Sequence, residues 1–168
     1  LMEGNKLSTK KIENLINDKL LITNLREKYY SYIKKFNANE SYLTDKAPLN
    51  FRWIGLIKIL FPNAKIIHCS RNSKDNCLSL YKNLFEGGLN FSYDQKELGT
   101  YYNLYSDLME FWKNFSPNLF YEAVYENIVN NQEEESKKII GFCDLTWDPE
   151  CLNFHQNKSP IKTMSTAQ

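Results

Sequence analysis

The residues best suited to bind an anion lie where an apolar run of the sequence meets a polar one. Residues 64–70 read A-K-I-I-H-C-S, which is typical of a buried parallel strand, and Arg71 follows directly. A helix is predicted over residues 73–86, with Ser73 as its N-cap and Ser79 two turns into it. Because ligands of open α/β sheets bind at the carboxyl ends of strands, a guanidinium and a hydroxyl placed there can hold one phosphate.

Arg71 is one of only three arginines among 21 basic residues. A planar guanidinium offers paired donors that a lysine lacks, so its use in a lysine-rich chain favours a binding role. The alternative interpretation is local: Arg71 pairs with Asp75 at the start of the helix, and Ser79 is an ordinary polar helix residue. The residues alone leave both interpretations open.

The overall composition is that of an ordinary single domain. The 168 residues include 21 basic and 20 acidic side chains, and this balance excludes proteins that coat polyanions, because those need a large field of one sign. No signal peptide is recognisable, and no run approaches the ~18 apolar residues of a membrane span. The four cysteines form no C-x-x-C pair and no zinc spacing, so we predict a reduced, cytoplasmic protein without a metal.

Alternating helices and strands are predicted to position these side chains. A helix that Thr23-Asn24 could bend is followed by a short extended piece at residues 42–44, and a second strand is predicted over residues 119–124. Asn50 and Asp94 are predicted N-caps. The predicted helices cover residues 8–36, 51–61, 73–86, 94–115 and 132–142. This order predicts one α/β domain over residues 1–168, with a mainly parallel sheet flanked by helices in three layers.

The series R-N-x-K-D-x-x-x-S-x-Y, which starts at Arg71, resembles the 3′-phosphate-binding signature of sulfotransferases that use 3′-phosphoadenosine 5′-phosphosulfate (PAPS). Upstream, D-K-A-P-L-N and L-F-P-N-A are similar to segments of bacterial sulfotransferases, which often carry tetratricopeptide repeats and resemble tyrosylprotein sulfotransferases. Downstream, Y-E-N-I-V and the segments at 145–155 and 163–168 continue the resemblance. The ordered series covers roughly residues 42–168 and implies a P-loop-like sulfotransferase fold.

The resemblance implies a role for Lys46. In this family a Lys or His at the equivalent position stabilises the negative charge that develops during transfer, as a cation does in phosphoryl transfer. Asp45 is expected to orient Lys46 or the backbone rather than to act as a base. The alternative for Lys46 is a solvated surface lysine, as for most of the other lysines of the chain.

The resemblance also implies a set of nucleotide contacts. Arg71 and Ser79 would hold the 3′-phosphate, and Tyr125 would contact the adenine. Ser165 would lie beside the nucleotide, with Thr163 as the alternative. Without the resemblance, Tyr125 is equally a core aromatic and the two late hydroxyls are equally turn residues.

Some parts of the family pattern have no counterpart in this sequence. No P-x-S-G-T-T-like loop, which wraps the 5′-phosphosulfate, occurs in residues 1–41. The general base of tyrosylprotein-type members is a Glu shortly after that loop, which is expected before Leu1 or at Glu3. We therefore expect the chain to lack the phosphosulfate loop and the C-terminal end of the domain. His68 is expected to be a hydrogen-bonded core residue, and no catalytic role is predicted for His155.

The predicted function is transfer of a sulfuryl group from PAPS to a hydroxyl or amine of a small-molecule or peptide acceptor, with 3′,5′-adenosine bisphosphate (PAP) as the product. No metal, nucleic acid or membrane span is expected, and the oligomeric state stays open. A non-catalytic module that binds PAP is the alternative. A P-loop nucleotide kinase is disfavoured, because G-x-x-x-x-G-K-[ST] is absent. The aromatic residues in 81–105 could line an acceptor cleft or pack in the core.

Overall fold

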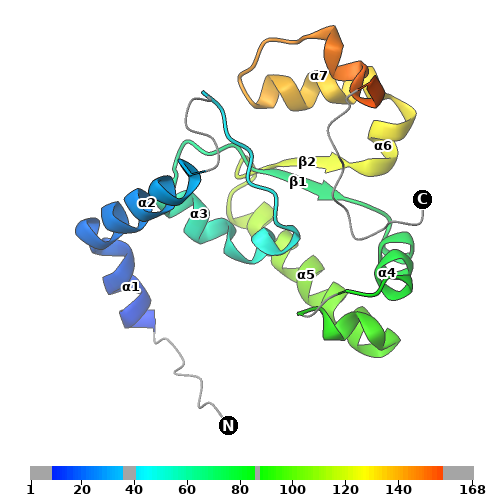
Figure 1. Cartoon of the computed structure of the whole chain (residues 1–168). Coiled ribbons are helices and arrows are strands. Elements are labelled where there is room, and N and C mark those ends of the chain that lie inside the picture. Colours follow the sequence, from blue (N-terminus) through cyan, green and yellow to red (C-terminus); the bar gives the residue numbers. More distant parts are fainter. Residues whose placement is uncertain (1–8, 36–40, 86–87, 157–168) are drawn as a thin grey trace. The chain divides into compact units, whose positions relative to one another are not determined.

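The computed structural model of the chain describes residues 9–35, 41–85 and 88–156 (Figure 1). The chain divides into two compact units, residues 1–64 and residues 65–168, which we call the first and the second unit.

The first unit begins with two helices, α1 (Thr9–Asn17) and α2 (Lys19–Ile33). Asp18 separates them, because its carboxylate accepts a hydrogen bond from the Leu21 N–H at 2.9 Å and so caps α2. The predicted bend at Thr23-Asn24 is wrong, since both residues lie inside α2. The region predicted to be helical is thus helical, but the chain breaks at Asp18. The spacing of the apolar residues does not reveal this cap.

The second part of this unit is a 3₁₀ helix, η1 (Pro48–Trp53), that leads into α3 (Ile54–Leu60). The prediction of one helix over 51–61 capped by Asn50 is wrong. Pro48 starts the turn earlier, and the Asn50 N–H donates to the Ala47 carbonyl inside η1 at 2.9 Å. Residues 42–44 form no strand.

Helix α2 packs against the end of α3 through a hydrogen bond and through aromatic contacts of Tyr29 and Tyr30 with Phe61. Arg26 Nε donates to the Leu60 carbonyl at 2.7 Å, where the last carbonyls of α3 have no helical partner. The Tyr29 ring lies 4.9 Å from the Phe61 ring, centroid to centroid. These contacts join the end of α3 to α2.

The second unit is built on two parallel strands, β1 (Ile67–Ser70) and β2 (Tyr121–Val124). Their register pairs His68 with Glu122 and Ser70 with Val124. The predicted strands are both present but shorter than expected. The expected burial of β1 is wrong, since Ile67 is 38% exposed: within the described residues, β1 has a neighbouring strand on one edge only.

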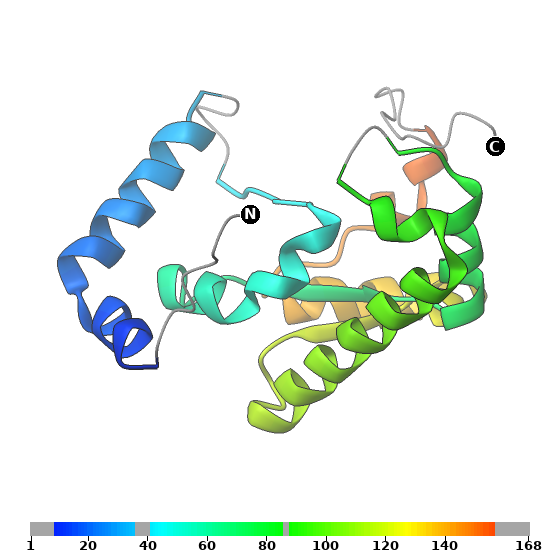
Figure 2. The same cartoon turned by 90° about the horizontal axis from the view of Figure 1, so that it is seen from below.

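Helices lie on both faces of this small sheet (Figures 1 and 2). On one face α5 (Gln95–Phe115) contacts β1 through Tyr105 and His68, and on the other α7 (Gln132–Phe142) contacts β2 through Phe142 and Tyr121. The second unit also contains the helices α4 (Ser73–Lys82) and α6 (Tyr125–Asn130). It further contains the 3₁₀ helices η2 (Asn90–Tyr93), η3 (Pro149–Leu152) and η4 (Phe154–Gln156). The chain is thus an α/β protein with a small parallel sheet, and the three-layer, P-loop-like arrangement stays a prediction.

Local side-chain chemistry sets the ends of these helices. Asp94 caps α5 as predicted, with its carboxylate accepting from the N–H groups of Lys96 and Glu97 at 2.8 and 2.9 Å. Helix α7 also has its predicted limits, whereas α6 was not predicted. The predicted cap Ser73 is wrong: Asn72 caps α4, and the helix ends at Lys82 rather than at residue 86. An Asn side chain competes well for the first free N–H groups of a helix, so the cap falls one residue earlier.

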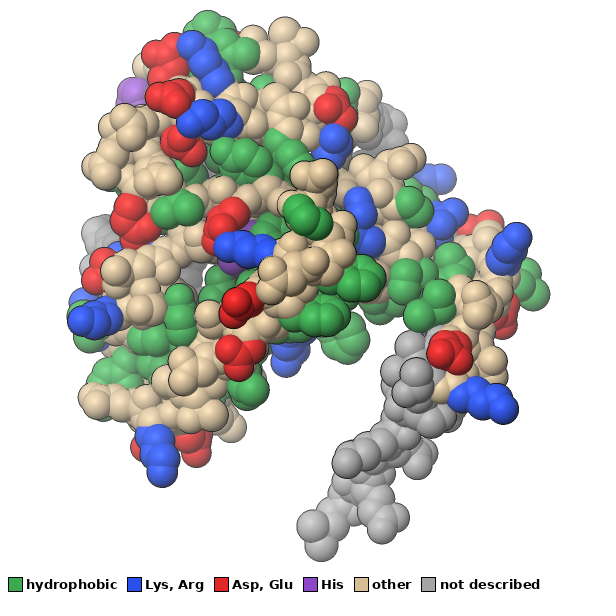
Figure 3. Space-filling model, turned by 180° about the vertical axis from the view of Figure 1, so that it is seen from behind, with side chains coloured by type: hydrophobic (Ala, Val, Ile, Leu, Met, Phe, Trp, Pro, Cys, Tyr) green, Lys and Arg blue, Asp and Glu red, His purple; other side chains and the backbone are tan. Residues whose placement is uncertain are grey.

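The buried apolar side chains of the second unit belong to α5 and to the second strand with the residue before it. Leu98 and Met109 of α5 are buried, as are Phe120 and Ala123 at the second strand. On the face seen in Figure 3, basic and acidic side chains are interspersed, in keeping with the net charge of +1. Among the described residues, no helix is long and apolar enough to cross a membrane.

The cap of α5 is open to a direct test. We expect Asp94→Ala to lower the free energy of unfolding by about 1 kcal/mol, because two N–H groups of the longest helix lose their acceptor. Urea unfolding followed by circular dichroism measures the change. Asp107→Ala, an exposed position inside the same helix, is the matched control and should change stability by less than about 0.5 kcal/mol. Equal losses in the two variants would contradict this account of the cap.

Candidate functional site

Two side chains lie next to each other directly after the carboxyl ends of β1 and β2. The register places Ser70 beside Val124, the last residue of each strand, so that Arg71 and Tyr125 directly follow the two strand ends. The guanidinium carbon of Arg71 lies 5.1 Å from the centroid of the Tyr125 ring, a cation–π contact. Arg71 is exposed and Tyr125 is 50% exposed, so both groups are accessible to a ligand.

The local alternative for Arg71 is not what the structure shows. Among the described residues, the ion pairs do not include one between Arg71 and Asp75. Arg71 faces Tyr125 instead, and none of the described carboxylates forms an ion pair with its guanidinium. The donors of its planar fork therefore remain available for an anion.

The turn between β1 and α4 is held by Asn72. Its side-chain oxygen accepts from the N–H groups of Lys74 and Asp75 at 3.0 and 3.4 Å. Its own N–H donates to Glu126 Oε1 at 2.9 Å. This hydrogen bond lowers the pKa of Glu126, and the nearby charge of Arg71 acts in the same direction. Sequence reasoning missed Glu126, although the Y-E pair in Y-E-N-I-V places it directly after Tyr125.

Ser79 is the third residue predicted for phosphate binding. It lies in α4, the helix that begins directly after Arg71 and Asn72, and its side chain is partly buried. Asn83 Nδ2 donates to the Ser79 carbonyl at 2.7 Å, at the end of that helix. The strand end and the following helix thus carry Arg71 and Ser79 on adjacent elements of one unit.

Lys46 lies in the first unit, in the irregular segment before η1, and is exposed. The neighbouring Asp45 accepts hydrogen bonds from the Tyr29 hydroxyl at 2.8 Å and from Asn50 Nδ2 at 3.3 Å. Burial and the Asp45 carboxylate raise the pKa of Tyr29 to about 12, so the phenol stays protonated as a donor. Asp45 therefore fastens the Lys46 segment to α2 and η1, and it forms no ion pair with Lys46. Ser165 and Thr163 lie outside the described residues.

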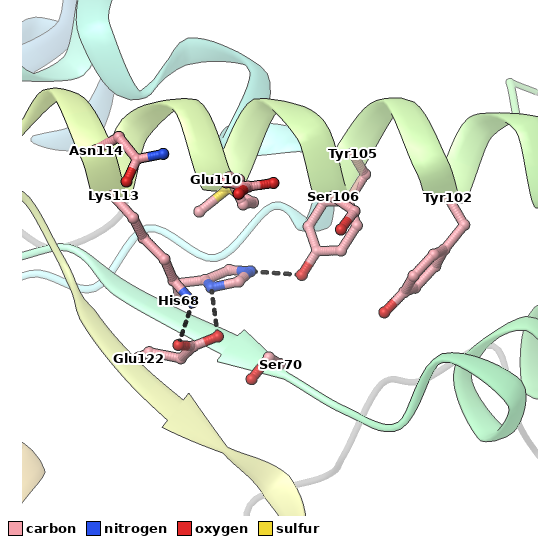
Figure 4. Close-up of a pocket in the computed structure, with 10 residues that line it drawn as sticks. His68, Ser70, Tyr102, Tyr105, Ser106, Glu110, Lys113, Asn114 and Glu122 are labelled. Atoms are coloured by element: carbon pink, nitrogen blue, oxygen red, sulfur yellow. Dashed lines mark hydrogen bonds and ion pairs between the residues drawn. The ribbon is translucent and has the colours of Figure 1, made fainter.

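A polar cavity of about 410 Å³ lies between α5 and the two strands (Figure 4). Side chains of β1 and β2 face it from one side and side chains of α5 from the other. The residues that line it are His68, Ser70, Tyr102, Tyr105, Ser106, Met109, Glu110, Lys113, Asn114 and Glu122.

His68 is a largely buried polar group of this cavity, with 9% of its side chain exposed. Its Nε2 lies 2.6 Å from the Tyr105 hydroxyl, which confirms the expected hydrogen-bonded core histidine. Glu122 approaches Nδ1 at 3.9 Å and accepts a hydrogen bond from Lys113 Nζ at 2.5 Å.

The charges in this cavity follow from burial and from the lysine. Burial lowers the pKa of His68 below its ordinary value, and Lys113 adds to this effect while Glu122 opposes it. His68 is thus neutral at neutral pH, and its approach to Glu122 is not an ion pair there. Lys113 lowers the pKa of Glu122 and so keeps that carboxylate ionised.

Sequence reasoning found His68 but not its partners. Tyr105, Lys113 and Glu122 come together only through the packing of α5 on β2, and no local spacing signals this. The described residues hold no group of three or more His, Cys, Asp or Glu that could bind a metal ion.

Comparison with known proteins gives a family match over most of the chain. The model of the family described as "Sulfotransferase family" matches residues 6–149. An "Uncharacterized protein" of Aquifex aeolicus (strain VF5) is 32% identical over 90% of this chain, and a "Putative protein-tyrosine sulfotransferase" of Caenorhabditis briggsae is 28% identical over 68% of it. The chain spans 20% and 41% of the lengths of these two relatives. No solved structure matches the chain.

The lowered pKa of His68 predicts how stability depends on pH. The unfolded chain binds a proton at this side chain near pH 6.5, whereas the folded chain binds it only at lower pH. The free energy of unfolding should therefore be at its plateau above about pH 6.5 and should fall as the pH drops below that value. Urea unfolding at pH 7.5 and 5.5, above the range where carboxylates titrate, measures the fall.

The variant His68→Gln should flatten this pH dependence. His155→Gln is the matched control, because His155 is exposed, and it should keep the wild-type profile. A wild-type profile in the His68 variant would show that another group causes the pH dependence.

Proposed function

Because the chain belongs to the sulfotransferase family, we propose that it transfers a sulfuryl group from PAPS to a hydroxyl or amine acceptor and releases PAP. The acceptor would be a small molecule or a peptide. The name of the Caenorhabditis relative refers to protein tyrosine, which supports a peptide hydroxyl as one acceptor class.

The observation that carries this proposal is the placement of Arg71 and Tyr125 at the carboxyl ends of paired strands. A guanidinium 5.1 Å from an aromatic ring offers phosphate donors beside a surface on which a base can lie. In the proposed complex, Arg71 binds the 3′-phosphate with Ser79 as a further donor, and Tyr125 contacts the adenine. The guanidinium is exposed and forms no ion pair with a carboxylate among the described residues, which fits this role.

Lys46 is the proposed catalytic residue. Its exposed ammonium would stabilise the negative charge that develops on the bridging oxygen and on the departing phosphate during transfer. The contacts of Asp45 with Tyr29 and Asn50 support this role, because they limit the freedom of the segment that carries the lysine. Ser165, or Thr163 in its place, is proposed as a further nucleotide contact.

Binding of PAP tests the nucleotide site. We expect Arg71→Ala to weaken PAP binding by about 10- to 100-fold, because charge-assisted hydrogen bonds to phosphate are lost. Arg71→Lys should restore only part of the affinity, since an ammonium lacks the planar fork. Isothermal titration measures the dissociation constants, and Arg52→Ala, at an exposed arginine of η1, is the control. Equal PAP affinity in the Arg71 and Arg52 variants would remove the basis of this site.

Transfer of labelled sulfate from PAPS tests the catalytic assignment. We expect Lys46→Ala to lower kcat by about 100- to 1,000-fold while the dissociation constant for PAP changes by less than about twofold. Lys28→Ala, at an exposed position of α2, is the control. A panel of phenols, amines and tyrosine peptides serves as acceptors. If a protein that also carries the upstream phosphosulfate loop binds PAP but transfers nothing to this panel, the non-catalytic PAP-binding module is favoured.

A further inference from the structure

A single hydrogen bond joins the two segments that carry Arg71 and Tyr125. Glu126 Oε1 accepts from the Asn72 N–H at 2.9 Å, although the two residues are 54 positions apart in the sequence. Asn72 follows Arg71 and Glu126 follows Tyr125. The bond therefore ties the turn after β1 to the first turn of α6, which directly follows β2, beside the cation–π pair.

Asn72 is fixed from two sides by this arrangement. Its backbone N–H is held by Glu126, and its side chain caps α4 through Lys74 and Asp75. A peptide unit held at its N–H has little freedom to rotate, and this unit includes the carbonyl of Arg71. The Glu126 carboxylate thus restrains both the backbone of Arg71 and the start of the helix that carries Ser79.

The charge of Glu126 acts on Arg71 without closing an ion pair. The carboxylate is near enough to Arg71 for its charge to be felt, but no ion pair between them occurs among the described residues. A negative charge at this place weakens the attraction of the site for phosphate, whereas the hydrogen bond orders the site. The two effects have opposite signs and can be separated by substitution.

We propose that Glu126 is a positioning residue, which holds Arg71 and α4 in place for a 3′-phosphate through its hydrogen bond to Asn72 and does not itself touch the nucleotide. This proposal rests on the proposed function, since it concerns the same nucleotide site. According to this proposal, the preference for a 3′-phosphorylated nucleotide depends in part on Glu126, which does not contact the phosphate.

The readout is the ratio of the dissociation constants for 5′-AMP and PAP, which differ by the 3′-phosphate. The wild-type chain should bind PAP at least about tenfold more tightly than AMP, because of the charge-assisted contacts to that phosphate. A general loss of structure would weaken both ligands, while a misplaced Arg71 weakens PAP alone. The ratio therefore separates a positioning role from a merely structural one.

Three substitutions test the hydrogen bond. Glu126→Ala and Glu126→Leu remove the acceptor, and we expect PAP binding to weaken by about three- to tenfold with AMP binding unchanged. Glu126→Gln keeps an acceptor oxygen and removes the charge, so PAP binding should equal or exceed that of the wild type. Asn127→Ala, at the next and exposed position of α6, is the matched control. Circular dichroism checks that the variants fold. If either the Ala or the Leu variant is unstable, the other still tests the loss of the acceptor.

The outcomes keep the two proposals apart. If the Arg71→Ala variant loses the preference for PAP while the Glu126→Ala and Glu126→Leu variants keep it, Glu126 has no positioning role and the nucleotide site stands. If the Gln variant is as weak as the Ala variant, the charge rather than the hydrogen bond matters, and the proposal is overturned. If the wild-type chain shows no preference for PAP over AMP, the proposed function fails and this inference fails with it.

Discussion

The parallel register of β1 and β2 is the constraint on which the arrangement of the second unit depends. Pairing Ser70 with Val124 brings the following residues, Arg71 and Tyr125, to one edge of the sheet. The same register pairs His68 with Glu122 on the face covered by α5. A slip of one residue would turn every side chain of a strand to the opposite face, so the site at the edge and the polar cavity under α5 are fixed together.

Much of the fold could be predicted, because its signals are local. The apolar run before Arg71 and the Asp94 cap each depend on a few neighbouring residues, and both are present in the structure. Two of the errors occur where two local signals compete. Asn72 and Ser73 are both good caps, and Pro48 starts a turn ahead of Asn50. The N-cap preferences of such neighbouring residues are too similar to predict which of them starts the helix.

In the candidate site, too, the residues that local sequence signals mark could be predicted, and the contacts between distant segments could not. Arg71 and Ser79 could be singled out because strand, turn and helix follow one another within a few residues. The bond from Asn72 to Glu126 spans 54 positions, and it exists only because the strands pair in one register. The cavity partners of His68 likewise depend on how α5 packs on the sheet. Sequence patterns name the groups that can do chemistry, and tertiary packing decides which of them meet.

The contact between Arg71 and Tyr125 has a consequence for the thermodynamics of binding. An arginine side chain that is free in water loses about 2 kcal/mol of rotamer entropy when it is immobilised on a ligand. A guanidinium that already rests against a ring has fewer rotamers to lose. The pair is thus preorganised, and a ligand that keeps the contact pays only part of the usual entropic penalty.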